Sequence, residues 1–252
     1  LGLLASAFAL TNVLGFERAL ASALLTSLTA PALAIAAARR GRRDGGEPLR
    51  WWGAAAAWSA VALLPSLAAG ATYEALTLPC DLEQGALFFV LLGGGNLAFG
   101  TSLGFALALA FPEDTRRARW MPALGVLLVG LGWLGSTLHR LYAEPQIFAF
   151  ATPFGYWPGS LYDEALEIGP ALWGFRAFGL LLSGSLLVIA RAFTDPERFR
   201  LSLPPHPVTL AGGLALAAGT GWAHGWGDEL GFDLDREDIT AALARRVETE
   251  HF

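Results

Sequence analysis

Long apolar stretches alternate with short polar segments along this chain. Six stretches approach or reach the ~20 residues that a helix needs to cross a bilayer; they cover residues 19–38, 51–71, 86–111, 121–138, 170–190 and 207–223. A seventh stretch, 1–14, is too short to span alone and is interpreted as the end of a span or signal segment that begins earlier. The stretches lack the period-two alternation of membrane strands. We therefore predict an all-α, polytopic transmembrane helix bundle with six full spans and one partial N-terminal span.

The arginines predict how this bundle is oriented, because they fall on alternate polar segments. Three segments hold five, three and three arginines: 39–50, 112–120 and 191–206. The alternate segments hold one, none and one: 15–18, 72–84 and 139–169. Cytoplasmic loops carry the excess of positive charge in membrane proteins. We therefore expect a bacterial inner-membrane protein whose arginine-rich side faces the cytoplasm. Its polar tail is then on the extracytoplasmic side.

Composition narrows the class of protein. The 252 residues are 54% hydrophobic and only 15% charged, with a mean hydropathy of +0.47, whereas soluble domains average about 25% charged residues. All 17 basic residues are arginine, and this usage, with many Ala, Gly, Leu and Pro, is typical of a GC-rich bacterial genome. The lipid bilayer is the expected partner. A nucleic-acid partner is not expected, because the arginines lie between apolar stretches rather than on one basic face.

Two regions differ in polarity, which predicts a transmembrane helical domain over 1–225 and an extracytoplasmic tail over 226–252. In the tail, Asp235 is a candidate N-cap, and acidic residues followed by arginines favour a helix through Val247. The last residues alternate like an opening strand. We therefore expect the tail to begin a C-terminal domain that continues past Phe252.

The span 86–111 contains small residues at helical spacing together with one amide: Gly93, Gly94, Gly95, Asn96, Gly100 and Gly104. Small residues four apart let helices approach closely, and a buried amide can bond between them. The expected role is tight helix packing. The alternative is a substrate path or an opening of the backbone at Asn96.

Arg176 is a charge within an apolar span, and such charges are candidates for functional sites. Its candidate partners are carboxylates expected on the same side of the membrane: Glu17, Glu74, Asp163, Glu164 and Glu167. The alternative is that Arg176 extends to the outer interface and reaches water there.

The segment 153–164 combines prolines and aromatic residues with two carboxylates, Asp163 and Glu164. Aromatic rings of this kind settle at the headgroup level. One interpretation is a catalytic site formed by Asp163, Glu164, His139 and Arg176. The other is an aromatic belt that caps the bundle.

Motifs for well-defined chemistry are absent from the sequence. It contains no Walker A sequence, no G-x-S-x-G elbow and no H-E-x-x-H helix. The acidic run from Asp233 departs from a calcium loop at Asp238 and Ala244. A zinc site from His139 and His224 has no further sequence support. We therefore predict no cofactor and no metal.

Two short motifs resemble known proteins: the segment 154–164 (FGYWPGSLYDE) and the segment 246–252 (RVETEHF). The first is similar to a group of multi-pass bacterial membrane proteins. The second resembles the opening strand of peptidase-MA-like, gluzincin-type metallopeptidase domains, which can follow a membrane region. The resemblance implies a membrane-anchored peptidase with its catalytic domain outside. The zinc-binding helix of that family is absent here, so no catalytic residue is carried over.

These observations give a first expectation and two alternatives for function. The first is a scaffold or anchor for an extracytoplasmic C-terminal domain, with a metallopeptidase implied by the resemblance. The alternatives are a transporter or permease subunit and a membrane enzyme acting on lipids at the outer interface. A transporter needs polar groups along a path near the midplane, and an interfacial enzyme needs Asp163, Glu164, His139 and Arg176 to converge. An anchor needs neither.

Overall fold

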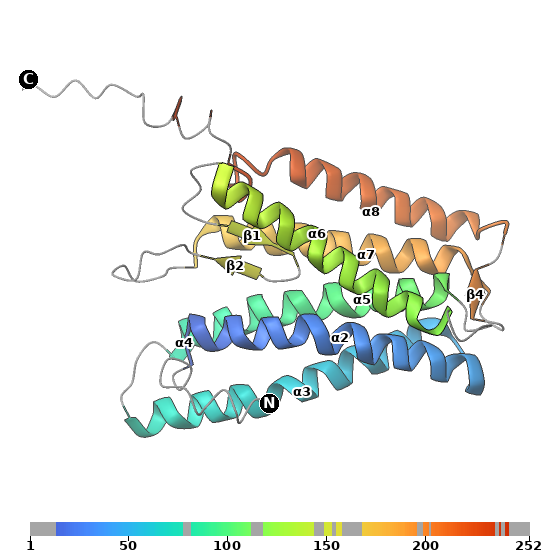
Figure 1. Ribbon diagram of the computed structural model, residues 1–252, viewed down its shortest axis with the longest axis horizontal. Coiled ribbons are helices and arrows are strands. Elements are labelled where there is room, and N and C mark those ends of the chain that lie inside the picture. The colour runs from blue at the N-terminus through green and yellow to red at the C-terminus, as the bar shows by residue number, and fades with distance from the viewer. Residues whose placement is uncertain are drawn as a thin grey trace, which may run out of the picture.

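The computed structural model describes residues 14–77, 82–111, 118–143, 149–152, 155–157, 168–195, 199–201, 203–234, 237 and 240–241. In these residues, long helices lie side by side along the long axis of the molecule, which is horizontal in Figure 1. They are α2 (Phe16–Asp44), α3 (Pro48–Thr77), α4 (Leu82–Phe89), the π-helical turn η2 (Val90–Gly94), α5 (Gly95–Ala110), the short 3₁₀ turn η3 (Ala118–Trp120), α6 (Met121–Ala143), α7 (Pro170–Ala192) and α8 (Pro207–Gly225).

Five of the six predicted spans are confirmed as helices long and apolar enough to cross a membrane. They are Phe16–Asp44, Pro48–Thr77, Leu82–Ala110, Ala118–Ala143 and Pro170–Ala192. The sixth predicted span forms the 19-residue helix α8, which is not among these five. All of the partial N-terminal span 1–14 except Leu14 lies outside the described part of the chain.

The helices extend beyond the apolar stretches that predicted them. The segment 39–50 was expected to be a loop, but α2 continues through the arginines to Asp44 and α3 begins at Pro48. The connection is therefore three residues long. Arginine is a good helix former, and positive charge in the last turn is favourable beside the helix C-terminus, so the helix does not stop where the apolar pattern stops.

Strands correct the all-α prediction in two places. The first hairpin pairs β1 (Ala149–Ala151) with β2 (Gly155–Trp157) in antiparallel register, Ala149 opposite Trp157. The second pairs β3 (Thr194–Asp195) with β4 (Arg200–Leu201). Strands of two or three residues are too short to show an alternating pattern in the sequence, so the helical pattern around them concealed both.

Small residues bring α2 and α5 together in the centre of the bundle. Five alanines of α2 are fully buried: Ala19, Ala23, Ala30, Ala34 and Ala38. Gly104 of α5 lies so close to α2 that an added Cβ would stand 2.5 Å from the carbonyl oxygen of Pro31. In lipid, close backbone approach of this kind provides the packing energy that holds helices together.

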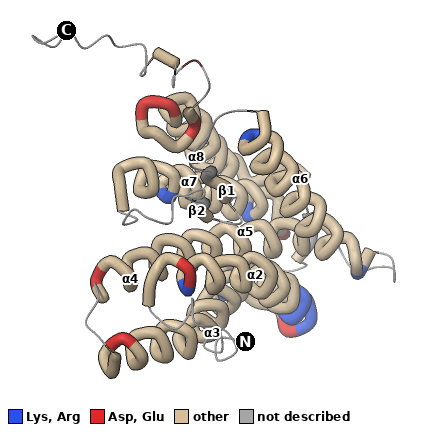
Figure 2. Tube along the Cα trace, turned by 60° about the vertical axis from the view of Figure 1, so that its left-hand side comes forward, with Lys and Arg blue, Asp and Glu red and all other residues tan. Residues whose placement is uncertain are grey.

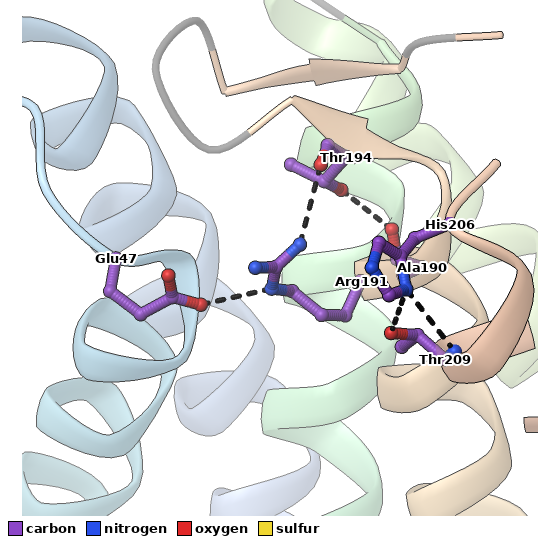
Figure 3. A network of polar contacts seen from close by, with 6 residues as sticks. All are labelled: Glu47, Ala190, Arg191, Thr194, His206 and Thr209. Carbon is purple, nitrogen blue, oxygen red and sulfur yellow. Dashed lines mark hydrogen bonds and ion pairs between the residues drawn. The ribbon is translucent and has the colours of Figure 1, made fainter. Parts of the chain in front are cut away.

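The arginine-rich segments meet at one end of the bundle, on the right of Figure 1. Arg39 donates to the Arg119 carbonyl oxygen at 2.6 Å, and Arg42 donates to the carbonyl oxygens of Ala108 and Phe199. Arg191 forms an ion pair with Glu47 at 2.9 Å and also contacts Thr194 (Figure 3). Figure 2 shows that charged residues gather at the helix ends. The described residues of the three arginine-rich segments therefore lie at one end of the bundle.

Candidate ligand-binding site

Arg176 of α7 is buried in the half of the bundle remote from the arginine-rich end. Helix α7 begins at Pro170, whose fixed φ suits the first helical position, and Arg176 follows about 9 Å along its axis. The side chain is only 4% exposed. It does not extend to the interface, and its Nη1 donates instead to the Oδ1 of Asn96 at 3.2 Å.

Asn96 joins this arginine to α2. It lies at the middle of the continuous helix 82–110, ~21 Å from either end, and is 1% exposed. Its Nδ2 donates to the carbonyl oxygen of Ala23 at 3.2 Å and to the Oγ of Ser27 at 3.1 Å. The amide therefore uses its donors on α2 and offers its oxygen to Arg176. The π-helical turn immediately before it is a type of irregularity frequent at functional sites.

Two glycines leave room for the guanidinium. A Cβ on Gly95 would stand 2.7 Å from Arg176 Nη1, and a Cβ on Gly155 would stand 2.9 Å from Nη2. Gly155 has φ +92°, a conformation that favours glycine. The β1–β2 hairpin thus brings its backbone against one side of the arginine, while α5 borders the other. A side chain at either position would therefore require the guanidinium to shift.

The guanidinium has more donors than partners. Arg176 Nε and Nη2 are buried and make no hydrogen bond within the described part of the chain, and the same holds for Thr152 Oγ1 in the adjoining hairpin. Phe175 supplies one ring 5.3 Å from Arg176 Cζ. A neutral amide and a ring compensate a buried charge only in part. An anionic group placed against Nε and Nη2 would satisfy both nitrogens.

Aromatic side chains cover the site on the arginine-poor side. Phe150 lies 5.2 Å from Phe175, and Phe232 lies 5.9 Å from Phe175 and 6.0 Å from Phe178, as ring centroids. Phe232 belongs to the segment after α8, which is held by Asp233. That carboxylate pairs with Arg140 of α6 and with His224 at 3.3 Å. The beginning of the polar tail is therefore part of the cover over α7.

An apolar groove lies on the other side of Asn96. Its volume is about 380 Å³, and α2, α5 and α6 line it. Pro31, Ile35, Leu103 and Leu127 are typical of its walls, whereas Ser27 and Asn96 are polar. Of the residues in α6, Pro122 is the buried one, and Leu127 and Leu131 are 55% and 53% exposed. The groove thus opens beside a helix that faces lipid, and Asn96 connects it to Arg176.

A second buried polar cluster lies between α2 and α3. Arg18 is fully buried and donates to the Ser66 carbonyl oxygen at 2.8 Å, and the hydroxyls of Ser22 and Ser66 are 2.9 Å apart. Glu74, two turns further along α3, is 3% exposed, and both its oxygens lack hydrogen bonds to described residues. The contacts of Arg18, Ser22 and Ser66 join α2 to α3.

The structure describes only some of the residues proposed from the sequence. Arg176 is buried against Asn96, whereas His139 is exposed on α6. Asp163, Glu164 and Glu167 lie outside the described residues. Of the other candidate partners for Arg176, Glu17 is exposed and Glu74 lies on α3.

The small residues of the Gly-rich span have different surroundings. Gly100 and Gly104 face Pro31 of α2, and Gly95 faces Arg176. Gly93 lies near Leu63 of α3, and a Cβ on Gly94 would meet nothing within 4 Å. Among the described residues, no three His, Cys, Asp or Glu side chains are grouped as a metal site would require.

Sequence reasoning missed Ser27, Thr152 and Gly155. A serine in an apolar helix is common, and the position of Gly155 beside a residue 21 positions later depends on how the hairpin folds back. The only available signal was the charge of Arg176 within an apolar stretch.

Comparisons with known proteins do not assign this chain to a class. No family model, no curated protein and no solved structure matches it. The geometry of the site and the apolar helices therefore carry the functional argument.

Proposed function

We propose that this chain is a multi-pass domain of a bacterial inner membrane that binds the anionic group of a ligand at Arg176. The observation that carries the proposal is the guanidinium itself. Its Nε and Nη2 are buried, unpartnered among the described residues, and confined by Gly95 and Gly155. A buried charge without an opposite charge costs several kcal/mol, and an anion would recover much of that free energy. Packing alone gives no reason for such a charge.

The proposal includes α8 as a sixth span. At 19 residues it is ~28 Å long, close to the thickness of the hydrocarbon core, and it lies alongside α7 in Figure 1. With α8 crossing, the arginine-rich end faces the cytoplasm and the segment from Trp226 onward lies outside. The cover formed by Phe232 and Asp233 is then on the extracytoplasmic side.

The site favours a ligand-binding role over a purely passive scaffold. A scaffold needs no buried unpaired charge, whereas a transporter or a lipid-modifying enzyme needs to hold its substrate. The anchoring of a C-terminal extracytoplasmic domain, including the metallopeptidase that the 246–252 motif resembles, is compatible with this role. It is tested by reading the parent gene past Phe252 for an H-E-x-x-H helix.

The anion site is tested with inorganic phosphate. The purified protein in neutral detergent is equilibrated overnight with phosphate or with chloride at matched ionic strength, and its thermal unfolding midpoint is measured. Phosphate at 100 times its dissociation constant adds about 2.7 kcal/mol to the free energy of unfolding. We expect a higher midpoint in phosphate for the wild type and no phosphate effect for Arg176→Gln.

Two controls make the result specific to Arg176. Arg40→Gln removes an arginine that is exposed at the arginine-rich end, and it should keep the phosphate effect. If phosphate has no effect and neutralising Asp163, Glu164 and Glu167 together destabilises the protein, Arg176 has an internal carboxylate partner. That outcome would overturn the proposal.

A further inference from the structure

We infer that the arginine-rich end of the bundle binds the headgroups of anionic phospholipids in the leaflet beside it. The surface concerned is formed by the last turn of α2 and the first turn of α3, and its exposed arginines are Arg43 and Arg50. It lies away from Arg176, which is in the other half of the bundle, so the inference is independent of any ligand at that site. Three features support it: the partners of the carboxylates, the apolar side chains nearby, and the charge of the opposite end.

The carboxylates of this surface are already paired. Asp44 accepts a hydrogen bond from Arg40 at 3.1 Å, and Glu47 accepts one from Arg191 at 2.9 Å (Figure 3). The segment 39–50 contains five arginines and only these two carboxylates. An excess of positive charge therefore remains when both ion pairs are formed.

Two arginines of this segment, Arg43 and Arg50, remain available to a ligand. Both are exposed, and their guanidinium groups make no hydrogen bond or ion pair with the described residues. Arg42, by contrast, is turned inward, where it donates to the carbonyl oxygens of Ala108 and Phe199. Guanidinium groups bind phosphate oxygens through parallel hydrogen bonds, so the exposed pair is suited to the phosphate of a lipid headgroup.

Apolar side chains are exposed at the same end as these charges. Leu49, directly before Arg50, is 43% exposed, and Trp120, directly before α6, is 69% exposed. Tryptophan is enriched where the membrane meets water, and its ring lies at the level of the headgroups. Arginine can rest its aliphatic stem on apolar surface while its guanidinium stays among polar groups. The combination favours a lipid headgroup over a water-soluble anion.

The opposite end of the bundle has the opposite charge. Exposed carboxylates that the structure describes there are Glu17, Glu83, Asp228 and Glu229. Salt screens exposed charges beyond about 10 Å, so each end acts on the leaflet beside it. Anionic lipid should therefore gather around this protein in one leaflet only, which is the cytoplasmic leaflet in the proposed orientation.

Two phospholipids with the same chains test the headgroup. Binding to the purified, delipidated protein in neutral detergent is measured by native mass spectrometry with dioleoyl phosphatidylglycerol, which is anionic, and dioleoyl phosphatidylcholine, which is zwitterionic. Each arginine near the headgroups adds to the attraction, so we expect phosphatidylglycerol to bind tighter by about tenfold or more. Equal binding of the two lipids would overturn the inference.

Paired variants assign the preference to the two arginines. Arg43→Gln with Arg50→Gln should remove the preference for phosphatidylglycerol, whereas Arg43→Lys with Arg50→Lys should keep it because the charges remain. The matched control is Thr72→Glu with Tyr142→Glu, which lowers the net charge by the same amount through two exposed residues at the opposite end. This control should also keep the preference.

The outcomes separate this inference from the proposed function. If the glutamine pair keeps the preference, or the control pair loses it equally, the arginine-rich surface is not the lipid site. Arg176→Gln should leave the preference unchanged, so a failure of the anion site at Arg176 does not decide this inference. Loss of the preference in Arg176→Gln, with the glutamine pair behaving like the wild type, would place the lipid at Arg176 and overturn the inference.

Discussion

At the scale of single residues, Asn96 is where three helices converge. Its amide group accepts a hydrogen bond from Arg176 of α7 and donates to Ala23 and Ser27 of α2. A carboxylate at this position would neutralise the arginine and occupy its donors. An amide instead orients the guanidinium while leaving its charge available, which suits a site for an anion better than a structural ion pair.

The confinement of Arg176 gives a prediction with an adjacent control. Gly95→Ala places a Cβ 2.7 Å from Nη1 of Arg176 and 2.9 Å from its Cδ, so the whole end of the side chain must shift. We expect a loss of about 1–3 kcal/mol in the free energy of unfolding, as for other overpacked positions, together with loss of the phosphate effect. Thermal unfolding with and without phosphate measures both.

Gly94→Ala is the control for that change. Its Cβ would meet nothing within 4 Å, so the smaller entropy of the unfolded chain should raise the free energy of unfolding by about 0.4–1 kcal/mol. If Gly95→Ala and Gly94→Ala have the same free energy of unfolding and the same phosphate effect, the space beside Arg176 is not restricted.

At the scale of elements, the α2–α5 pair depends on close backbone approach. Gly104→Ala brings a Cβ to 2.5 Å from the Pro31 carbonyl oxygen and 2.7 Å from its Cα. Backbone atoms cannot move aside as a flexible side chain can, so the helices must separate. We expect a loss of about 1–3 kcal/mol, measured as a lower unfolding midpoint. Gly135→Ala on α6, with open space around its Cβ, should not lower the midpoint; if it does so equally, the α2–α5 explanation is wrong.

The sequence could predict the helices but not their irregular parts. A run of apolar residues specifies a membrane helix because the backbone must satisfy its own hydrogen bonds in lipid, so five spans were found. The helical state of Arg39–Arg43 was missed because helix formation does not require apolar side chains. The π-helical turn at Val90–Gly94 and the hairpin at Gly155 depend on neighbouring helices, and a single sequence contains no record of those contacts.

For the candidate site, the sequence predicted individual residues but not the contacts between them. Arg176 and Asn96 were both recognised as polar residues within apolar stretches. Their pairing was not, because it depends on the rotation of α5 relative to α7. That rotation is fixed by packing between residues far apart in the chain.

At the scale of the whole molecule, the orientation in the membrane has a convenient probe. Cys80 is the one cysteine in the sequence, and it belongs to the arginine-free segment 72–84 that we expect outside. A membrane-impermeant maleimide added to intact spheroplasts should label it. Asp44→Cys in a Cys80→Ala background, at the exposed end of α2, should be labelled only after lysis. The reverse pattern would invert the proposed topology.

The sparse burial of α6 bears on how this helix is held in the bundle. Pro122 is the buried residue of the helix. Polar contacts join it to its neighbours near both ends, where Arg119, directly before the helix, contacts Arg39 and Arg140 pairs with Asp233. The surface between these two ends is therefore left to the hydrocarbon chains of the bilayer.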